Sequence, residues 1–381
     1  MKIIISYVTA GTGHRRAAEA IADAARQSLP GAEVACVDLL THAPWWVRWA
    51  YPTFYRLLVG YLPWCWALGY DALDHPWVFR ACQPLRRCWN ALMAGRFLRW
   101  VRSRQPDVVI ATHFFPAEVL GAAHQAGRLS SRVIVVITDL FPHRLWLVPG
   151  ADAVAVGSHE TKALCQQRGV REDRLHVVGI PIGPGFGPSA DRSLIASQLK
   201  LDPRRRTVLM VSGGMGLGPL HDLVRRVVAL EATRPGQLQL LVVCGQNTRL
   251  MHQLQEVGAA SAMPLRLFGF VDTSIMRELM GASDLLVTKG GGITIMEALA
   301  TGLPMVFHGV IPGQEQFNAE YVVAGGAGVM TRRRDDVVGI ILRVLDEPRQ
   351  LEVMRAHAVA LSKPQAAQQL IELINVAKQT L

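Results

Sequence analysis

A histidine follows two closely spaced glycines near the start of the chain, in the segment Gly11-Thr-Gly-His14. The segment lies between an apolar run and an alanine-rich stretch at residues 15–27 that predicts a helix. Glycine lets the backbone turn tightly beside a ligand, and the amides at a helix start favour negative charge and lower the pKa of a nearby histidine. His14 is therefore a candidate neutral base, although an isolated histidine more often serves in capping or packing. No Walker motif or third glycine of the dinucleotide fingerprint is present, so the segment gives little support for a cofactor site.

Three further segments in the second half carry polar groups suited to a nucleotide sugar. Val211-Ser-Gly-Gly-Met-Gly-Leu-Gly218 offers free backbone amides, and Thr288-Lys-Gly-Gly-Gly-Ile-Thr-Ile-Met-Glu297 opens a helix with three glycines. Helix-start amides suit a phosphate, and the carboxylate of Glu297 can accept from a ribose diol. Either segment alone could be a structural turn, but two of them at consecutive strand ends predict a nucleotide site. Pro312-Gly-Gln-Glu-Gln-Phe-Asn318 can bind sugar hydroxyls or be an ordinary polar loop.

Short apolar runs bounded by turn residues alternate with helical patterns, as in parallel sheets covered by helices on both faces. The runs lie at residues 2–8, 33–39, 107–112 and 132–138, and again at 207–212, 238–244, 264–268, 284–288 and 304–307. Residues 179–188 are rich in glycine and proline and predict a flexible linker. We therefore expect an α/β chain of two Rossmann-like domains facing a cleft, residues 1–183 and 184–381, with the last helix able to pack back on the first domain.

Residues 42–104 interrupt this rhythm with a helical, aromatic-rich insertion. Eight of the nine tryptophans and four of the six tyrosines lie between Trp45 and Trp100, with seven arginines and only two acidic residues, Asp71 and Asp74. Tryptophan and tyrosine favour the headgroup level of a bilayer, and arginine is attracted to anionic lipid. The insertion therefore predicts a monotopic contact with an anionic membrane surface. Core packing is an alternative, and single-stranded nucleic acid is disfavoured because no OB or RRM signature accompanies the insertion.

Charge and composition restrict the class of protein further. The formal net charge of +10 indicates a negative partner, which could be nucleic acid, anionic lipid or a phosphorylated substrate. Arg48 and Arg56 interrupt the apolar stretches, so we expect no spanning helix, and the N-terminus does not resemble a secretory signal. The six cysteines form no CxxC pair, which favours buried thiols in a reducing cytosol over disulfides or zinc.

These segments in this order resemble the GT-B glycosyltransferases related to the peptidoglycan GlcNAc-transferase, and more closely the monogalactosyl- and glucosyl-diacylglycerol synthases. The resemblance covers nearly the whole chain, and it departs at Thr12, where relatives often carry glycine. Its most specific parts are Gly11-Thr-Gly-His14, Thr138-Asp139 with His143 and Trp146, Gly179-Ile-Pro-Ile182, Lys289-Gly-Gly-Gly-Ile-Thr-Ile-Met-Glu297 and Pro312-Gly-Gln-Glu-Gln-Phe-Asn318. It implies a UDP-sugar donor on the second domain and a lipid acceptor, diacylglycerol, approached by the first domain from the cytoplasmic side of a membrane.

The resemblance also implies a role for each matching residue. His14 matches the catalytic base, with Asp139 as a second candidate or an orienting partner. The acceptor loop comprises Gly11, Thr12 and Gly13, together with His143 and Trp146. The donor site comprises Gly213, Gly214, Gly291 and Gly292 around the diphosphate, Glu297 on the ribose, Phe270 and Val271 beside uracil, Gln314 and Glu315 on the sugar, and Thr294 and Asn318.

The implied reaction is an inverting transfer of galactose or glucose to the primary hydroxyl of diacylglycerol. His14 would take the proton while the oxygen attacks the anomeric carbon opposite UDP. Helix-start amides would stabilise the departing diphosphate, and the chain has no Asp-x-Asp motif, so we expect no metal and no other cofactor. Transfer to another lipid or hydrophobic acceptor, a UDP-sugar epimerase on a similar scaffold, and nucleotide-regulated membrane binding without catalysis are the alternatives.

Overall fold

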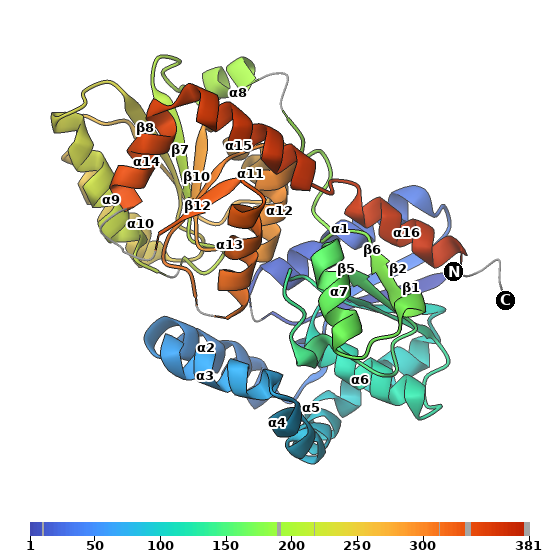
Figure 1. Cartoon of the computed structure of the whole chain (residues 1–381). Coiled ribbons are helices and arrows are strands. Elements are labelled where there is room, and N and C mark those ends of the chain that lie inside the picture. Colours follow the sequence, from blue (N-terminus) through green and yellow to red (C-terminus); the bar gives the residue numbers. More distant parts are fainter. Residues whose placement is uncertain (10, 189–191, 217, 312, 332–336, 377–381) are drawn as a thin grey trace. The chain divides into compact units, whose positions relative to one another are not determined.

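The computed structural model describes residues 1–9, 11–188, 192–216, 218–311, 313–331 and 337–376. This part of the chain divides into two compact units (Figure 1). The first contains the chain up to Pro184, residues 313–314 and the C-terminal segment from Lys363; the second contains Gly185–Ile311 and Glu315–Ser362. Each unit is built on one parallel six-stranded sheet with flanking helices, which confirms the expected α/β class of two Rossmann-like halves.

The first sheet has the strand order β2-β1-β3-β4-β5-β6. Its strands are β1 (Lys2–Tyr7), β2 (Glu33–Asp38), β3 (Val108–Ala111), β4 (Arg132–Val136), β5 (Ala153–Val156) and β6 (Leu175–Val177). Its helices outside the insertion are α1 (Gly13–Ser28), α6 (Phe114–Gln125), α7 (His159–Gln167) and α16 (Ala366–Val376), with short 3-10 turns η1 (Leu39–His42), η2 (Arg144–Trp146) and η3 (Glu172–Arg174). The chain runs from β1 outward to β2 and then returns to β3 on the other side of β1. The strand order therefore reverses between β1 and β3, where ligands of such sheets bind.

Alternate residues of the central strands divide the first core into two faces, as the two-residue period of a strand requires. Ile3 and Ile5 of β1 pack with Ile21 of α1 and Leu370 of α16, whereas Ile4 packs into the opposite core with α5 and α6. The C-terminal helix α16 thus lies on the first unit beside α1. Both faces of the sheet are covered, which explains the continuous apolar runs of its strands.

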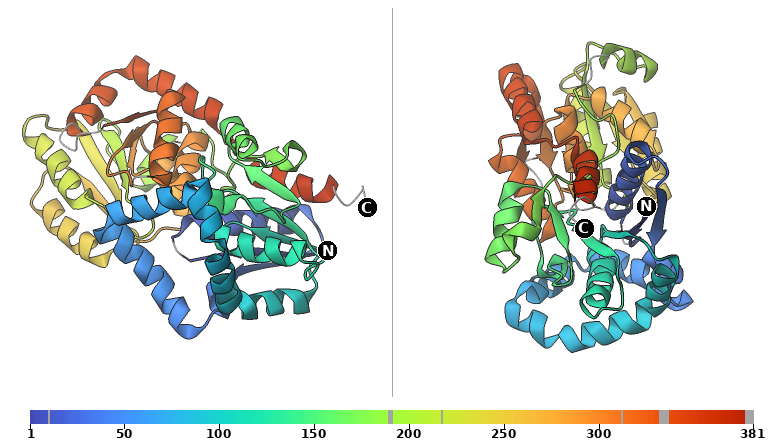
Figure 2. Two further views of the ribbon diagram at one scale, coloured as in Figure 1. Left: turned by 60° about the horizontal axis from the view of Figure 1, so that its bottom comes forward. Right: turned by 90° about the vertical axis from the view of Figure 1, so that its right-hand side faces the viewer.

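The insertion between β2 and β3 forms four helices, α2 (Trp45–Tyr61), α3 (Pro63–Asp74), α4 (Pro76–Ala81) and α5 (Gln83–Arg104). In Figure 2 these helices, in blue, form an arm outside the first sheet. The C-terminal half of α5 joins the core through Met93, Phe97 and Val101. Arg86 of α5 also pairs with Glu118 of α6 at 3.3 Å. The expected helical character of the insertion is confirmed, and α5 attaches it to the sheet.

The second sheet has the strand order β12-β11-β10-β7-β8-β9. Its strands are β7 (Arg206–Val211), β8 (Leu238–Val243), β9 (Leu265–Phe268), β10 (Leu285–Thr288), β11 (Met305–Phe307) and β12 (Gly328–Met330). Its helices are α8 (Arg192–Gln198), α9 (Leu220–Val228), α10 (Thr248–Ala259), α11 (Thr273–Gly281), α12 (Gly292–Thr301), α13 (Gln314–Ala324), α14 (Val337–Asp346) and α15 (Pro348–Leu361), with the turn η4 (Ala229–Ala232). Here the order reverses between β7 and β10, which again marks the expected ligand position.

The segment at residues 179–188 differs from a freely exposed linker. It has no regular structure, as its glycines and prolines predict, but Ile180 and Ile182 are only 1% and 4% exposed. Gly179 has a φ of +97°, and a Cβ at this position would lie 2.7 Å from the Cβ of Lys363. The apolar side chains between the glycines are packed against the protein, and the boundary between the two units, at Pro184 and Gly185, lies within the predicted linker.

Candidate active site

The reversal point of the first sheet brings together polar groups from three strand ends. His14 lies in the first turn of α1, which follows β1, and Thr112 directly follows β3. Thr138 comes two residues after β4. Nδ1 of His14 lies 2.8 Å from the carbonyl oxygen of Thr112 and 2.9 Å from Oγ1 of Thr138. Residues more than 90 positions apart in the sequence therefore fix one imidazole nitrogen.

This contact determines the tautomer of His14. A carbonyl oxygen can only accept, so Nδ1 must carry the proton and donate it to Thr112. Nε2 then holds the lone pair of the neutral ring. The hydroxyl of Thr112 also donates to the carbonyl oxygen of His14 at 2.9 Å, which ties the start of α1 to the end of β3. The ring thus presents a proton acceptor, the form that a general base requires.

Aromatic rings surround His14. The ring of His113 lies 4.6 Å from it in an edge-to-face arrangement, and the ring of the buried Trp146 lies at 6.1 Å. Burial lowers the pKa of His14 to about 4, against the opposing effect of its bond to Thr112. Desolvation disfavours the imidazolium, so the ring is neutral at physiological pH.

Asp139 is 2% exposed at the carboxyl end of β4. The pKa of Tyr70 is raised well above its usual value by burial first and by the charge of Asp139 second. The groups that contact Nδ1 of His14 are Thr112 and Thr138. Asp139 therefore belongs to the same strand-end cluster, while backbone and hydroxyl oxygens orient the histidine.

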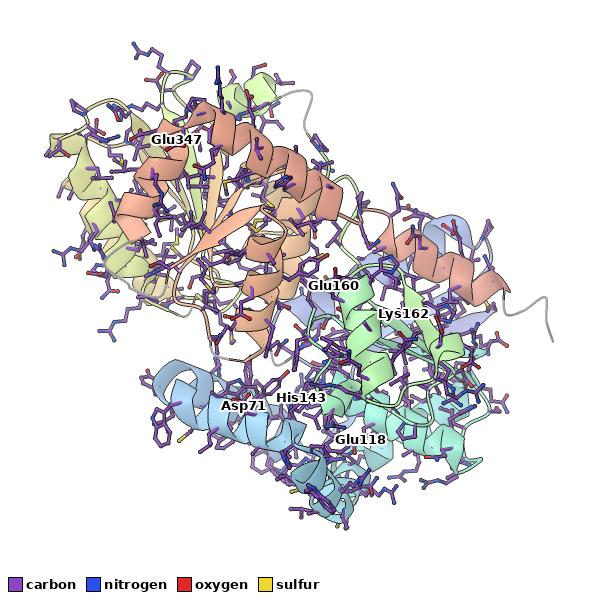
Figure 3. The ribbon with its side chains drawn as sticks, in the orientation of Figure 1. Asp71, Glu118, His143, Glu160, Lys162 and Glu347 are labelled. Carbon is purple, nitrogen blue, oxygen red and sulfur yellow. The ribbon has the colours of Figure 1, made fainter. Side chains whose placement is uncertain are left out.

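His143 connects the insertion to the first sheet. Its Nδ1 accepts from the amide of Leu145 at 3.1 Å, so Nε2 carries the proton and donates to the carbonyl oxygen of Tyr70 at 2.8 Å. Its ring lies 4.1 Å from the ring of Tyr70, and Figure 3 shows it beside α3, which carries Asp71. Burial lowers the pKa of His143. This histidine is buried, neutral and bonded at both nitrogens, so it positions α3, and Trp146 forms the wall beside His14.

The glycine loop before His14 is open. Thr12 is the N-cap residue of α1 but makes no side-chain cap bond, and Gly13 begins the helix. A Cβ placed on Gly11 would meet no atom within 4 Å, and the φ of Gly11 lies outside the left-handed region. Neither backbone strain nor neighbouring protein atoms require a glycine at position 11. A glycine here leaves the backbone accessible to a ligand, because it has no side chain.

At the reversal point of the second sheet, the loop after β7 is held in a fixed shape. Gly213 has a φ of +72°, and its carbonyl oxygen accepts from the amide of Gly216 at 3.1 Å. The carbonyl oxygen of Gly214 accepts from the amide of Gln246 at 2.9 Å. A Cβ on Gly245 would lie 2.5 Å from the oxygen of Gly214, so the loops after β7 and β8 are in close contact. These contacts preorganise the segment that the sequence assigned to a diphosphate.

The loop after β10 adds a helix start and a cation. Gly291 is the N-cap of α12 with no side-chain cap bond and an ordinary φ of −64°, and a Cβ there would meet nothing within 4 Å. The first amides of α12 begin at this open position, where an anion is favoured. Lys289 is 13% exposed, and its Nζ and Cε lie 3.8 and 3.7 Å from a Cβ built on Gly213. The ammonium group therefore lies where both loops meet, at a position to which the sequence pattern gave no role.

Glu315 and Asn318 of α13 complete this arrangement. Glu315 pairs with Lys289 at 3.5 Å and accepts from the amide of Ile311 at 3.3 Å. Asn318 is fully buried and donates to the carbonyl oxygen of Gly290 at 3.1 Å. Gly290 has a φ of +116°, so Asn318 stabilises the turn itself. The structure thus shows Asn318 in a contact that supports the loop.

The remaining predicted donor residues lie on neighbouring elements. Gly292 and Thr294 lie in the first turn of α12, and Glu297 is buried one turn further on. Phe270 is 45% exposed while Val271 is buried, in the loop after β9. Gln314 begins α13 and is half-buried. Gly269 approaches Gly245, which places the loop carrying Phe270 next to the loops described above.

The insertion exposes apolar side chains to an unusual degree. In the described part of the chain, 14 of the 20 exposed large hydrophobic residues lie between Trp45 and Leu92. Trp45, Trp77 and Trp49 are 82%, 74% and 69% exposed. The alternative in which the insertion is an ordinary buried helical pair is therefore wrong for these side chains. Single-domain surfaces rarely expose so many large apolar groups together unless something binds there.

No helix in the described ranges combines the length and apolar character needed to cross a bilayer. No group of three or more His, Cys, Asp or Glu side chains is arranged to hold a metal ion in the same residues.

Comparison with known sequences gives matches over both units. A family described as monogalactosyldiacylglycerol (MGDG) synthase matches residues 14–182, and one described as glycosyltransferase family 28 C-terminal domain matches residues 207–370. Monogalactosyldiacylglycerol synthase 1, chloroplastic, of Arabidopsis thaliana is 30% identical over 380 residues, which are 97% of this chain and 70% of that protein. The processive diacylglycerol beta-glucosyltransferase of Bacillus subtilis (strain 168) is 29% identical over 276 residues, 71% of this chain and 69% of that protein.

Solved structures share the fold at low identity. MnaA of S. aureus, in a co-structure with UDP, has a TM-score of 0.63 and 14% identity and is matched over 100% of this chain and 97% of its own. Acinetobacter baumannii MurG has a TM-score of 0.62 and 15% identity, over 98% of this chain and 99% of its own. At this identity the likeness shows the fold alone, which is the expected GT-B class.

Proposed function

The chain belongs to the monogalactosyldiacylglycerol synthase family of glycosyltransferases, and from this membership we propose that it transfers galactose or glucose from UDP to the free primary hydroxyl of diacylglycerol, with inversion at the anomeric carbon. The observation that carries the proposal is His14, whose Nδ1 is bonded to Thr112 while Nε2 keeps its lone pair. A base of this kind is what a neutral hydroxyl needs in order to attack.

The acceptor oxygen forms the new bond to the anomeric carbon while the bond from that carbon to the UDP oxygen breaks. The hydroxyl proton moves to Nε2 of His14, and UDP leaves with the bonding electron pair. Because burial makes His14 a weak base, the proton transfer is concerted with bond formation rather than complete before it. Asp139, buried at the carboxyl end of β4, is the alternative base.

The diphosphate is assigned to the second unit. The amides at the start of α12 and in the loop containing Gly213 and Gly214 donate to its oxygens, and Lys289 supplies a positive charge. Fixed amides of this kind stabilise charge that develops on a leaving group without reorganising. Glu297 binds the ribose, Phe270 and Val271 bind uracil, and Gln314 and Glu315 bind the hexose.

The lipid reaches the first unit through the insertion. Its exposed tryptophans enter the headgroup region of a bilayer, its arginines contact anionic lipid, and the protein acts as a peripheral protein on the cytoplasmic side. The contacts of His143 with Tyr70 hold this arm on the sheet that carries His14.

The test uses the purified full chain, vesicles containing diacylglycerol, and radiolabelled UDP-galactose or UDP-glucose in separate reactions. We expect label in a monohexosyl lipid with one of the two donors, and the configuration at its anomeric carbon gives the stereochemistry. His14→Ala should lose about 10²- to 10⁴-fold in turnover with unchanged UDP affinity, and Asp139→Asn should lose less. His159→Ala, at an exposed histidine of the same unit, is the matched control.

Two outcomes would contradict the proposal. Full turnover in His14→Ala would remove this residue from the mechanism, and no affinity for UDP in calorimetry would remove the donor site. A reaction without lipid identifies the epimerase alternative, because only an epimerase converts the UDP-sugar alone.

A further inference from the structure

His113 lies next to the proposed base but has no assigned role. It follows Thr112 at the end of β3 and is the N-cap residue of α6, where its Nδ1 accepts from the amide of Phe115 at 3.0 Å. The proton of the neutral ring is therefore on Nε2. His113 is 2% exposed, so one hydrogen bond and the surrounding packing fix this ring.

The rings around His113 hold it against His14. The His113 and His14 rings meet edge to face, with centroids 4.6 Å apart and an interplanar angle of 76°. The ring centroid of Phe114 lies 4.1 Å from that of His113. The ring centroid of Trp146 lies within 6.5 Å of those of both histidines. The bonds to Thr112 and Thr138 fix one nitrogen of His14 but leave the ring able to tilt about that nitrogen. The contact with His113 restricts that tilt.

We infer that His113 is a positioning residue for His14: its fixed, buried ring excludes water from one side of the His14 imidazole and holds that imidazole at the angle in which Nε2 meets the acceptor. This inference rests on the proposed function in one respect only, namely that the group meeting Nε2 is the acceptor hydroxyl. The packing and the exclusion of water are properties of the two rings themselves.

The charges near His14 support this assignment. Arg15 and Arg16 follow it on α1, and Arg15 pairs with Glu19 at 2.9 Å. Asp139 lies after Thr138 at the end of β4, and His113 is the titratable side chain in direct ring contact. Burial lowers the pKa of His113 well below its usual value, and the charge of His14 lowers it further. The two rings therefore do not carry positive charge together, and His113 stays neutral when His14 takes a proton.

Two substitutions separate the ring of His113 from its capping bond. His113→Asn keeps an acceptor for the amide of Phe115, since asparagine is a good N-cap residue, but it removes the ring. His113→Phe keeps a ring beside His14 and removes the acceptor. A purely structural role in capping predicts damage in His113→Phe, whereas positioning of His14 predicts damage in His113→Asn.

The readout is the protonation of His14, followed by NMR on the full chain with ¹⁵N-labelled histidine and assigned by the loss of its signal in His14→Gln. We expect the titration midpoint to rise in His113→Asn from about 4 toward the ordinary histidine value of about 6.5, and to stay low in His113→Phe. The pH below which kcat/KM falls should rise by the same amount in His113→Asn, while KM for the UDP-sugar is unchanged. Equal midpoints in wild type and His113→Asn, or the same rise in both variants, would overturn the inference.

A measurement on the wild-type chain covers the case in which His113→Asn does not fold. The ¹⁵N shifts should show His113 neutral with its proton on Nε2, and His14 with its proton on Nδ1, from about pH 5 to 8. A protonated His113 or the opposite tautomer of either ring in that range would overturn the inference. Because NMR needs no turnover, a chain that shows the expected shift but transfers no sugar contradicts only the proposed function.

Discussion

The imidazole of His14 is neutral because its surroundings desolvate it, and this gives the reaction a specific pH dependence. The unprotonated ring is the active form, so kcat/KM falls as the pH drops through the pKa of the free enzyme's base. Burial lowers that pKa to about 4. We expect kcat/KM to stay level from neutral pH to about pH 5 and to fall roughly tenfold per unit below about pH 4.

The measurement is a pH series of initial rates with circular dichroism at each pH. Unfolding releases buried neutral histidines, which then bind protons, so the folded state loses stability as the pH drops below about 6.5 toward the lowered values. Rates count only where the fold is intact. An acid limb near the ordinary histidine value in an intact protein would mean that His14 is not the base or is not buried during turnover.

Lys289 provides a second prediction at the scale of one residue. Its ammonium group lies between the loop at Gly213 and the start of α12 and pairs with Glu315. Charge-assisted bonds to phosphate contribute about 1.5–3 kcal/mol, so Lys289→Ala should weaken UDP binding by roughly 10- to 100-fold. Calorimetry with uridine is the internal control, because uridine lacks the diphosphate and should bind both proteins alike. Lys162→Ala, at a lysine paired with Glu172 in the first unit, controls for lost charge.

The motif residues of both sites were predictable, but their supporting groups were not. His14, Gly213 and Gly291 follow strands and precede helices, a local pattern that the sequence displays directly. Thr112 acts through its backbone carbonyl, which any residue type would provide, so no sequence signal marks it. Lys289 stands directly before three glycines, and that position after a strand was the available signal.

At the scale of elements, nine of the twelve strands were predicted within one or two residues, and β5, β6 and β12 were not marked. These three contain four, three and three residues, and a short apolar run of this kind is recognised only where turn residues bound it clearly, as at β11. The expected strand at residues 132–138 ends at Val136, because the chain turns there toward the polar residues Thr138 and Asp139. The order of strands in each sheet depends on long-range pairing, which local periodicity does not encode.

The attachment of the insertion also leads to a prediction about an element. Asp74 ends α3, and Arg168, which follows α7, donates to both of its oxygens at 2.6 and 2.8 Å. Burial raises the pKa of Asp74, but the bonds from Arg168 and the Arg144 amide outweigh it and hold the pKa below its usual value. Asp74→Asn removes the negative charge that pairs with Arg168 and should cost about 2 kcal/mol of stability.

We expect this loss to be local to the arm. Hydrogen exchange should accelerate in α3 and not in the second unit, because α3 loses its bond to the sheet. Asp173→Asn is the matched control, since its pair with Arg171 is exposed and contributes little. Unchanged exchange in α3 of Asp74→Asn would mean that packing around Tyr70 and His143 holds the arm by itself.

At the scale of the whole molecule, two forces should act together at a membrane, and salt separates them. The net charge of +10 attracts anionic vesicles. The screening length of this attraction falls from about 10 Å at 0.1 M salt to about 3 Å at 1 M. Insertion of exposed tryptophan rings does not depend on that distance. Binding to anionic vesicles should therefore exceed binding to neutral ones at low salt, and a residual, equal affinity for both should remain at high salt.

The residual affinity should disappear when the most exposed rings are removed. Trp45, Trp49 and Trp77 lie on α2 and α4, so replacing all three by serine leaves the sheet and both sites intact. Full burial of one large apolar side chain contributes about 1.5–3 kcal/mol, so even partial insertion of three predicts a loss of at least tenfold in high salt. Val353→Ser with Val359→Ser, exposed residues on α15, should change nothing. Vesicle flotation measures all three proteins, and a triple variant that still floats in high salt would show that the arm's tryptophans do not contact lipid.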